Sequence, residues 1–274
     1  MKSDFMRSVY ILSLLLIFTG LMNPLIAAED SDVVWNGSLK KFFFADRPIQ
    51  DAEGVIALDA PVRAEDGAVV PIQITAGFPQ TTERYIKTVS LVIDRNPSPM
   101  AGRFHFSPKS GKADLALRIR VNEYSPVRVI AETNDGKLFM ASRFVKATGG
   151  CSAPVGTDLD AARKRLGKIR MKTRATGLYE PVQTQLAVSH PNLTGLQKDQ
   201  VSLLFIPSHF IQKINVTFEG EQIFSAETDI SVSENPNFRF YFVPEKAGKM
   251  IAEIEDSRGM RFTQSYDYSA SKTN

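Results

Sequence analysis

Residues 127–154 read VRVIAETNDGKLFMASRFVKATGGCSAP and contain two apolar-rich runs, a turn and the single cysteine of the chain. The runs flank Asn134-Asp135-Gly136, and Asp and Gly tolerate the positive φ angles that tight hairpin turns require. This pattern predicts an antiparallel hairpin whose second strand, 137–145, continues toward the cysteine. Because glycine loses much backbone entropy on ordering, we expect Cys151 on an exposed, mobile loop, with Gly149 and Gly150 as a flexible arm.

The chain before this hairpin shows the same β pattern. Short apolar or alternating runs are separated by turn residues about every dozen positions, a spacing typical of antiparallel sandwiches. Strands are expected at 55–58, 68–74, 86–93, 104–106 and 115–121.

The chain after the cysteine loop is again rich in strand patterns. Strands are expected at 168–174, 182–189, 201–206, 213–218, 238–243, 250–255 and 261–266. One helix is expected at 157–167, where Thr157 can cap the start and Gly167 ends the helix.

The predicted fold class is therefore all-β, with two immunoglobulin-like antiparallel β-sandwich domains joined by a short helix-containing linker. The domains are expected at residues 29–146 and 168–268. Residues 147–167 hold the cysteine loop and the helix, and 269–274 form a C-terminal tail.

The N-terminus has the features of a cleavable signal peptide over residues 1–28. A short basic region precedes the apolar run 9–22, and Ala27-Ala28 supplies small residues for cleavage. The run is shorter than the roughly 20 residues that a membrane span needs. We therefore expect an exported periplasmic protein that has no membrane association after cleavage.

The charge of the chain is nearly balanced. Residues 1–28 hold two of the 33 basic and one of the 30 acidic residues, so their removal lowers the net charge from +3 to +2. A balance of this kind gives no indication of nucleic-acid binding.

A single cysteine cannot form a disulfide within its own chain, so Cys151 is either free or paired with another molecule. In an oxidising compartment a lone thiol is explained most simply if its reactivity is used. An inert buried cysteine is the alternative, and the flanking glycines favour exposure over burial.

Familiar catalytic motifs are missing from the sequence. It has no nucleophile elbow, P-loop, dinucleotide fingerprint or zinc-protease helix motif. His105, His190 and His209 leave a metal site or a Cys–His dyad open, although hydrogen-bonded structural histidines are the commoner case. We predict no metal ligands, no cofactor and no catalytic residue.

Residues 168–174 alternate strictly between basic and other residues, which places the basic side chains on one face of a strand. These are Lys168, Arg170, Lys172 and Arg174. Two interpretations are open: a charged sheet edge that resists strand addition, or a surface near the thiol that attracts anions.

Two sets of short motifs, in order along the chain, resemble a known pair of families. Residues 55–151 resemble SoxY, the thiol carrier of periplasmic sulfur oxidation. The motifs are Ala64-Glu65-Asp66-Gly67, Asn96-Pro97-Ser98-Pro99, Ser125-Pro126-Val127-Arg128, Ala131-Glu132-Thr133-Asn134-Asp135-Gly136-Lys137-Leu138 and Gly149-Gly150-Cys151. Residues 168–268 resemble SoxZ, through His190-Pro191, Thr194-Gly195, Ile206-Pro207, Ser233-Glu234-Asn235-Pro236, Ala247-Gly248 and Asp256 with Gly259.

The whole set is most similar to fused SoxYZ-like carriers associated with quinoprotein dehydrogenases. The resemblance implies two packed immunoglobulin-like sandwiches and a cysteine that binds a sulfur intermediate covalently, as in thiosulfate oxidation. The sequence departs from ordinary SoxY because Ser152-Ala153 replaces two terminal glycines and more than a hundred residues follow.

The function predicted from the sequence is a non-enzymatic periplasmic carrier, with Cys151 as the attachment site for small sulfur-containing cargo. Its predicted partners are periplasmic Sox-type or quinoprotein dehydrogenase enzymes. The alternatives are an accessory docking module for a quinoprotein dehydrogenase and a thiol-dependent redox enzyme. The enzyme alternative lacks a resolving cysteine and a recognisable base.

Overall fold

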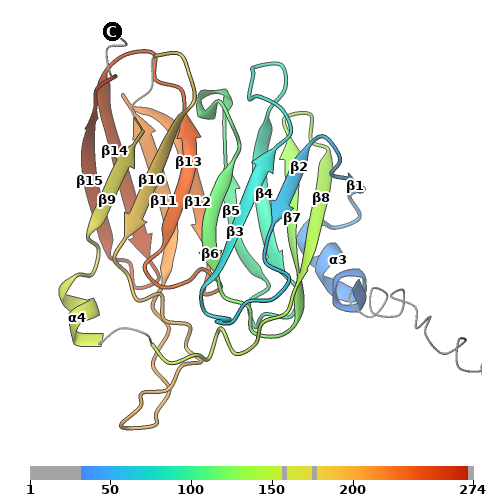
Figure 1. Cartoon of the computed structure of the whole chain (residues 1–274), viewed down its shortest axis with the longest axis vertical. Helices are drawn as coiled ribbons and strands as arrows, with labels where there is room; N and C mark the ends of the chain where they lie inside the picture. Colours follow the sequence, from blue (N-terminus) through green and yellow to red (C-terminus); the bar gives the residue numbers. More distant parts are fainter. Residues whose placement is uncertain (1–31, 156–158, 175–177, 271–274) are drawn as a thin grey trace, which may run out of the picture.

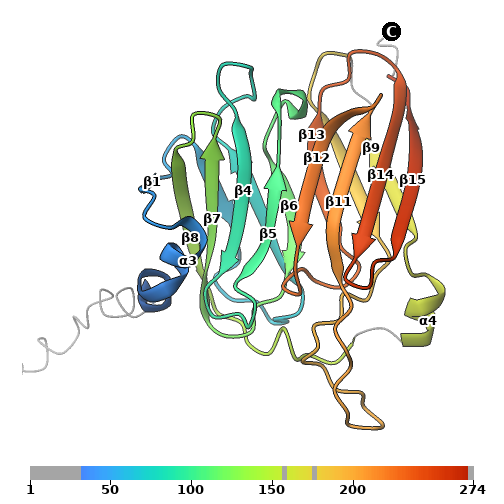
Figure 2. The ribbon, with the colours of Figure 1, turned by 180° about the vertical axis from the view of Figure 1, so that it is seen from behind.

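The computed structural model describes residues 32–155, 159–174 and 178–270, and it confirms the all-β fold class. Two sheets pack face to face (Figures 1 and 2). The first contains nine strands in the order β1 (Ile49–Asp51), β8 (Leu138–Val145), β7 (Ser125–Thr133), β4 (Ile86–Ile93), β5 (Met100–His105), β12 (Glu221–Thr228), β11 (Ile211–Phe218), β14 (Gly248–Asp256) and β15 (Arg261–Tyr268). The second contains six in the order β2 (Ile56–Asp59), β3 (Val70–Ala76), β6 (Leu115–Ile119), β13 (Asn237–Phe242), β10 (Val182–Val188) and β9 (Ile169–Thr173).

Both sheets continue without a break from the first half of the chain into the second. β5 pairs antiparallel with β12, where Phe104 lies opposite Ala226, and β6 pairs with β13 at Ala116 and Arg239. One hydrophobic core extends through both halves. Phe104 joins the halves directly, since its ring lies 6.4 Å from that of Phe224. The two predicted sandwiches thus share their sheets as well as a core.

Strand burial explains why these segments form a sandwich. β3 and β10 alternate between buried and more exposed side chains, which is the pattern of strands with one face on the core. β7 is buried on both faces, because a helical segment covers its outer side. The predicted hairpin is confirmed as β7 and β8, and Gly136 has the positive φ of 79° that its turn requires.

The covering segment is a structure that sequence patterns did not predict. A π-helical turn, η2 (Trp35–Leu39), continues into α3 (Lys40–Phe44) and packs against the nine-stranded sheet. Trp35 and Leu39 contact Ile130 and Leu138 there. None of the helices in the described part of the chain has the length and apolar character of a membrane span. The predicted signal peptide, 1–28, lies outside the described residues.

Two other expectations need correction. The strand expected at 201–206 is absent, because this segment forms an exposed turn with a single bridge between Lys198 and Phe205. β12 was not predicted, since its sequence begins with polar residues. The expected helix is present as α4 (Leu159–Lys164) and ends three residues before the predicted Gly167. It lies at the outer side of the second half instead of between the halves (Figure 1). Thr157, its expected cap, lies outside the described residues. A single 3₁₀ turn, η3 (Pro108–Ser110), precedes β6.

Candidate functional site

The loop that carries Cys151 leaves β8 and runs along one end of the sandwich (Figure 1). Its backbone is hydrogen-bonded to the segment that follows β6. The Gly149 N–H donates to the Asn122 carbonyl at 2.8 Å, and the Gly150 N–H donates to the Val121 carbonyl at 3.1 Å. The Cys151 N–H donates to Asn122 Oδ1 at 3.3 Å. The first half of the molecule therefore holds the loop by three consecutive amides.

The two glycines before the thiol allow close packing at this point. A Cβ atom on Gly150 would lie 2.0 Å from the Gly67 carbonyl oxygen, so only glycine fits between the two backbones. Gly149 has a φ of 71°, which a residue with a side chain rarely adopts. Glycine is needed here to bring the loop against the core, where sequence reasoning expected it to make the loop mobile.

The second half of the molecule holds the other side of the loop. The Thr194 hydroxyl donates to the Cys151 carbonyl at 2.6 Å, and Gln197 Nε2 donates to the Ala153 carbonyl at 3.1 Å. Gln197 Oε1 also accepts the Thr194 N–H at 3.1 Å, which fixes the two side chains together. We call these two donors, Thr194 and Gln197, the latch. Cys151 thus lies between the halves, held by both.

The predicted exposure of Cys151 is wrong. The residue is fully buried at 0% relative accessibility and forms no disulfide. Burial raises the pKa of its thiol to about 11, an effect that the nearby positive charge of Arg120 only partly opposes. A thiol with such a pKa is almost entirely protonated at neutral pH and reacts slowly, because the thiolate is the nucleophile. In this conformation the thiol is protected.

Arg120 is the charged residue that acts on the pKa of the Cys151 thiol, and the sequence analysis did not identify it. It directly precedes Val121 and Asn122, which bind the loop, and only 2% of its surface is exposed. Its Nη2 donates to the Asn192 carbonyl in the second half at 2.9 Å. Its Nε is buried without a hydrogen-bond partner.

Two of the three histidines form a buried cluster with Asp256. His209 Nε2 lies 2.7 Å and His190 Nε2 lies 3.5 Å from the same carboxylate oxygen, Oδ2. Burial raises the pKa of Asp256, but hydrogen bonds from His209 and from two backbone N–H groups outweigh it and leave that pKa below its usual value. Burial, with the neighbouring His209, lowers the pKa of His190 to about 4, so His190 is neutral at neutral pH.

The hydrogen bonds of this cluster favour a structural role over metal binding. The ligand atoms of the three residues lie within 4.8 Å of one another, close enough for an ion. His190 Nδ1, however, accepts the Asn192 N–H at 3.1 Å, so the neutral ring carries its proton on Nε2. That proton occupies the atom a metal would need. His105 bonds to Thr88 on a neighbouring strand, 3.1 Å away, and the described contacts of the thiol include no histidine.

The basic strand lies at the edge of the six-stranded sheet. β9 is the outermost strand, and the four predicted basic side chains are all exposed. This position confirms that the basic strand lies at a sheet edge, while protection of that edge from strand addition stays a prediction. Attraction of anionic cargo by the same face stays a prediction.

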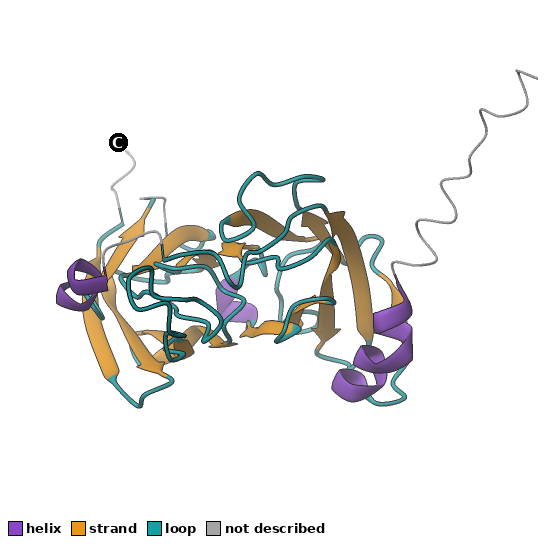
Figure 3. Cartoon of the chain, turned by 90° about the horizontal axis from the view of Figure 1, so that it is seen from below, coloured by secondary structure: helices purple, strands orange, loops and turns teal. Residues whose placement is uncertain are grey.

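A long segment between β10 and β11 extends beyond the thiol end of the sandwich (Figure 1), and the view onto that end shows loops lying across it (Figure 3). Its tip, which we call the apolar turn, exposes large apolar side chains to solvent: Val201 at 92%, Leu203 at 69%, Leu204 at 70% and Phe205 at 62%. The base of the same segment contains the latch residues. A surface of this kind is typical of a contact site for another protein.

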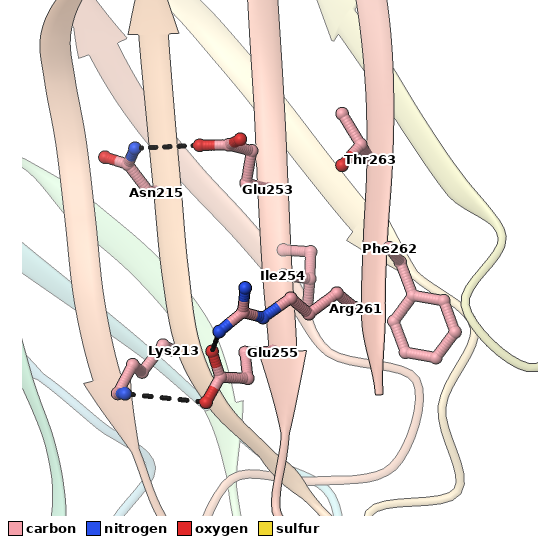
Figure 4. Close-up of a pocket in the computed structure, with 8 residues that line it drawn as sticks. All are labelled: Lys213, Asn215, Glu253, Ile254, Glu255, Arg261, Phe262 and Thr263. Carbon is pink, nitrogen blue, oxygen red and sulfur yellow. Dashed lines mark hydrogen bonds and ion pairs between the residues drawn. The ribbon is translucent and has the colours of Figure 1, made fainter. Parts of the chain in front are cut away.

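A pocket on the exposed face of β11, β14 and β15 offers no comparable chemistry (Figure 4). Its charged side chains are already paired. Glu255 accepts from Arg261 at 3.2 Å and from Lys213 at 3.5 Å, while Asn215 bonds to Glu253. None of the residues predicted to be functional lines it.

Comparison with known families gives two matches in tandem. A model of the sulfur oxidation protein SoxY matches residues 40–151, and a model of the sulphur oxidation protein SoxZ matches residues 169–267. The SoxY match ends on Cys151. No curated protein matches the chain.

Solved structures with a similar fold include the sulfur carrier protein SoxY from Chlorobium limicola f thiosulfatophilum. It is 28% identical over 44% of this chain and 93% of its own, with a TM-score of 0.33. A superoxide reductase (neelaredoxin) from Ignicoccus hospitalis is 18% identical over 34% of this chain and 79% of its own, with a TM-score of 0.31. The family assignment rests on the two family matches, because TM-scores this low carry no argument.

Proposed function

The chain belongs to the fused SoxYZ-like sulfur carrier proteins. From this we propose that Cys151 is the residue to which the cargo is covalently attached. The proposal is supported mainly by one observation. The only thiol of the chain stands at the last residue of the SoxY match and is enclosed between the SoxY and SoxZ halves. A residue that both halves hold in place is well situated for a function that requires both.

Attachment would form a disulfide-type bond between Cys151 Sγ and a sulfur atom of the cargo. With thiosulfate as the cargo, the thiol loses one proton, two electrons pass to a redox partner enzyme, and the product is a cysteine S-thiosulfonate. In the described part of the chain no general base is found at the thiol, and the oxidant is the partner enzyme. We therefore propose a non-enzymatic role, in which partner enzymes load and unload the group.

Loading requires the loop to open, because the closed thiol is buried and protonated. Opening breaks the two latch hydrogen bonds and exposes the cysteine side chain. Such changes cost roughly 3 kcal/mol together. About one molecule in a hundred would then be open at equilibrium, enough for a partner to capture. The closed state would shield the thiol from unwanted oxidation between encounters.

The partners proposed are periplasmic Sox-type enzymes or a quinoprotein dehydrogenase. The apolar turn gives such a partner a docking surface on the same segment that carries Thr194 and Gln197. Binding there would place the partner beside the latch. Residues 1–28 are proposed as the signal peptide that directs the protein to the periplasm.

The intact mass of the protein, purified from the periplasm of cells grown on reduced sulfur compounds, tests this function. We expect an added sulfur or thiosulfonate group that disappears on reduction and is absent from Cys151→Ser. An unmodified mass under all conditions, together with full partner activity in Cys151→Ser, would overturn the carrier role. That second result would favour the accessory docking module.

A further inference from the structure

We propose that the Arg120 guanidinium is an anion-binding group for the cargo, which pairs with the negatively charged end of a sulfur group attached to Cys151. The proposal rests on the carrier function proposed above and adds a residue that holds the anionic end of the cargo. Its consequence is selectivity: the folded protein should retain anionic adducts better than neutral ones.

The first observation is that Arg120 is a buried cation with an incomplete set of hydrogen bonds. The carboxylates of Glu234 and Asp66 attract its charge electrostatically, but its side chain has one described hydrogen bond, to the Asn192 carbonyl at 2.9 Å. Its Nε–H points to no acceptor. A guanidinium has five N–H donors and cannot be deprotonated at physiological pH. A charge left this way in a protein interior is unfavourable, so a ligand that completes its bonds is expected to bind it well.

The second observation is the position of Arg120 relative to the thiol. The next two residues, Val121 and Asn122, accept the amides of Gly150 and Cys151. The side chain of Arg120 reaches Asn192, two residues before Thr194, which bonds to the Cys151 carbonyl. The segment around Arg120 therefore contacts the cysteine loop, and its side chain contacts the segment that carries Thr194. The Arg120 guanidinium and the Cys151 thiolate are close enough for each to shift the pKa of the other.

The chemistry of the group explains the expected preference. A sulfonate end has three oxygen acceptors and a permanent negative charge, and guanidinium N–H groups bind such oxyanions in charge-assisted pairs. With a neutral adduct the Nε–H stays unpaired and the buried guanidinium gains no further negative charge beside it. With an anionic adduct both deficits are removed at once.

Two chemically defined adducts test the proposal in the full mature chain. The unfolded, reduced protein reacts with tetrathionate: the Cys151 thiolate attacks an inner sulfur, one S–S bond breaks, thiosulfate leaves, and Cys151 carries –S–SO₃⁻. A second sample reacts with tert-butyl methanethiosulfonate, which releases methanesulfinate and leaves the neutral –S–C(CH₃)₃ group of similar shape. Both samples are refolded, and their masses and Tm values are measured.

We expect the thiosulfonate form of the wild type to melt roughly 4–8 °C above the tert-butyl form, the shift that charge-assisted hydrogen bonds give in a chain of this size. In Arg120→Gln the difference should vanish or reverse, and in Arg120→Lys part of it should remain. The same difference in wild type and Arg120→Gln would overturn the proposal. If Arg120→Gln does not fold, the wild type decides alone, because a thiosulfonate form that melts below the neutral form also overturns it.

The adducts are made chemically, so this experiment does not depend on loading in the cell. If the native protein never carries an adduct, the carrier function fails while the melting comparison still measures the anion site. If native adducts are found but Arg120→Gln has no effect on either form, only the role of Arg120 fails.

Discussion

Two regions of the SoxY half each contain a buried arginine. In one region the guanidinium is fully paired, and in the other it is not. At the N-terminal flank, Arg128 is 1% exposed and lies in a complete ion pair: its Nε and Nη2 donate to both oxygens of Asp94 at 2.8–3.0 Å. Asp32 accepts a further bond, and the Trp35 ring covers the guanidinium at 4.9 Å. At the thiol end, Arg120 has a single carbonyl partner and an unpaired Nε.

The difference separates a structural charge from one that is available to a ligand. The bonds of Arg128 are satisfied within the chain, and they fasten the N-terminal helical segment to the sheet. Burial of the Arg120 charge brings no such gain to the fold, and the residue stands beside the only thiol. Perturbed and incompletely paired charges of this kind concentrate at functional sites.

The largest effect is expected when the Arg128 pair is broken. Asp94→Asn leaves the guanidinium buried without its main counter-ion and should lower the free energy of unfolding by about 3 kcal/mol or more. Arg120→Gln in the reduced protein removes an incompletely hydrogen-bonded charge and should change the free energy of unfolding by about 1 kcal/mol at most, in either direction. Urea unfolding of both variants measures this. Equal losses of unfolding free energy in Asp94→Asn and Arg120→Gln would show that the two arginines do not differ in their structural role.

A smaller effect is expected from the ionisation of Cys151. The thiol has an ordinary pKa of 9.0 when unfolded and about 11 when folded. A raised folded pKa gives stability that is complete below pH 9 and lost between pH 9 and 11. The loss should reach roughly 2–3 kcal/mol, at 1.36 kcal/mol for each pKa unit.

Unfolding measurements from pH 8 to pH 11 on wild type and Cys151→Ala isolate this contribution, because other titrating groups are common to both. In Arg120→Gln the window should extend to higher pH, since the charge that opposes the shift is gone. Parallel curves for wild type and Cys151→Ala would contradict the burial of the thiol.

Sequence patterns predicted most strands, because alternation and turn residues depend on local chain chemistry. β4 and the β7–β8 hairpin were placed within a residue or two. The N-terminal helical segment was missed, because Trp35 and Leu39 gain their stability from a distant sheet face. The strand expected at 201–206 was wrong because an apolar run does not distinguish a buried strand from an exposed contact surface.

The candidate site was only partly predictable. The identity of Cys151 follows from composition, but its burial depends on Gly67, Thr194 and Gln197, which lie far away in the sequence. The role of Arg120 could not be predicted from the sequence, because a basic residue at the end of a strand is common. Only its unpaired Nε is informative, and that is a property of the folded chain.

A further test concerns the latch at the thiol end. Thr194→Val removes the donor to the Cys151 carbonyl while keeping the side-chain shape, and it should cost about 1 kcal/mol and speed thiol alkylation roughly five-fold. Thr184→Val is the matched control, because Thr184 is equally buried in the same half but its hydroxyl has no partner. The control should alkylate at the wild-type rate. Indistinguishable alkylation of the two variants would show that the latch does not restrain the thiol.

The smallest effect on stability, and a large one on function, is expected at the apolar turn. Leu204 and Phe205 are exposed, so replacing both with Ser should change stability by less than about 0.5 kcal/mol. If a partner docks there, the same change removes apolar contact area and should slow unloading of a Cys151 adduct by the purified partner enzyme about ten-fold or more.

Phe42→Ser is the control at the N-terminal flank, because Phe42 is 79% exposed and lies on α3 beside the Arg128 region. It should leave unloading unchanged. Equal slowing by both changes would indicate a general effect of lost surface hydrophobicity, and no slowing by either would place the partner contact elsewhere on the molecule.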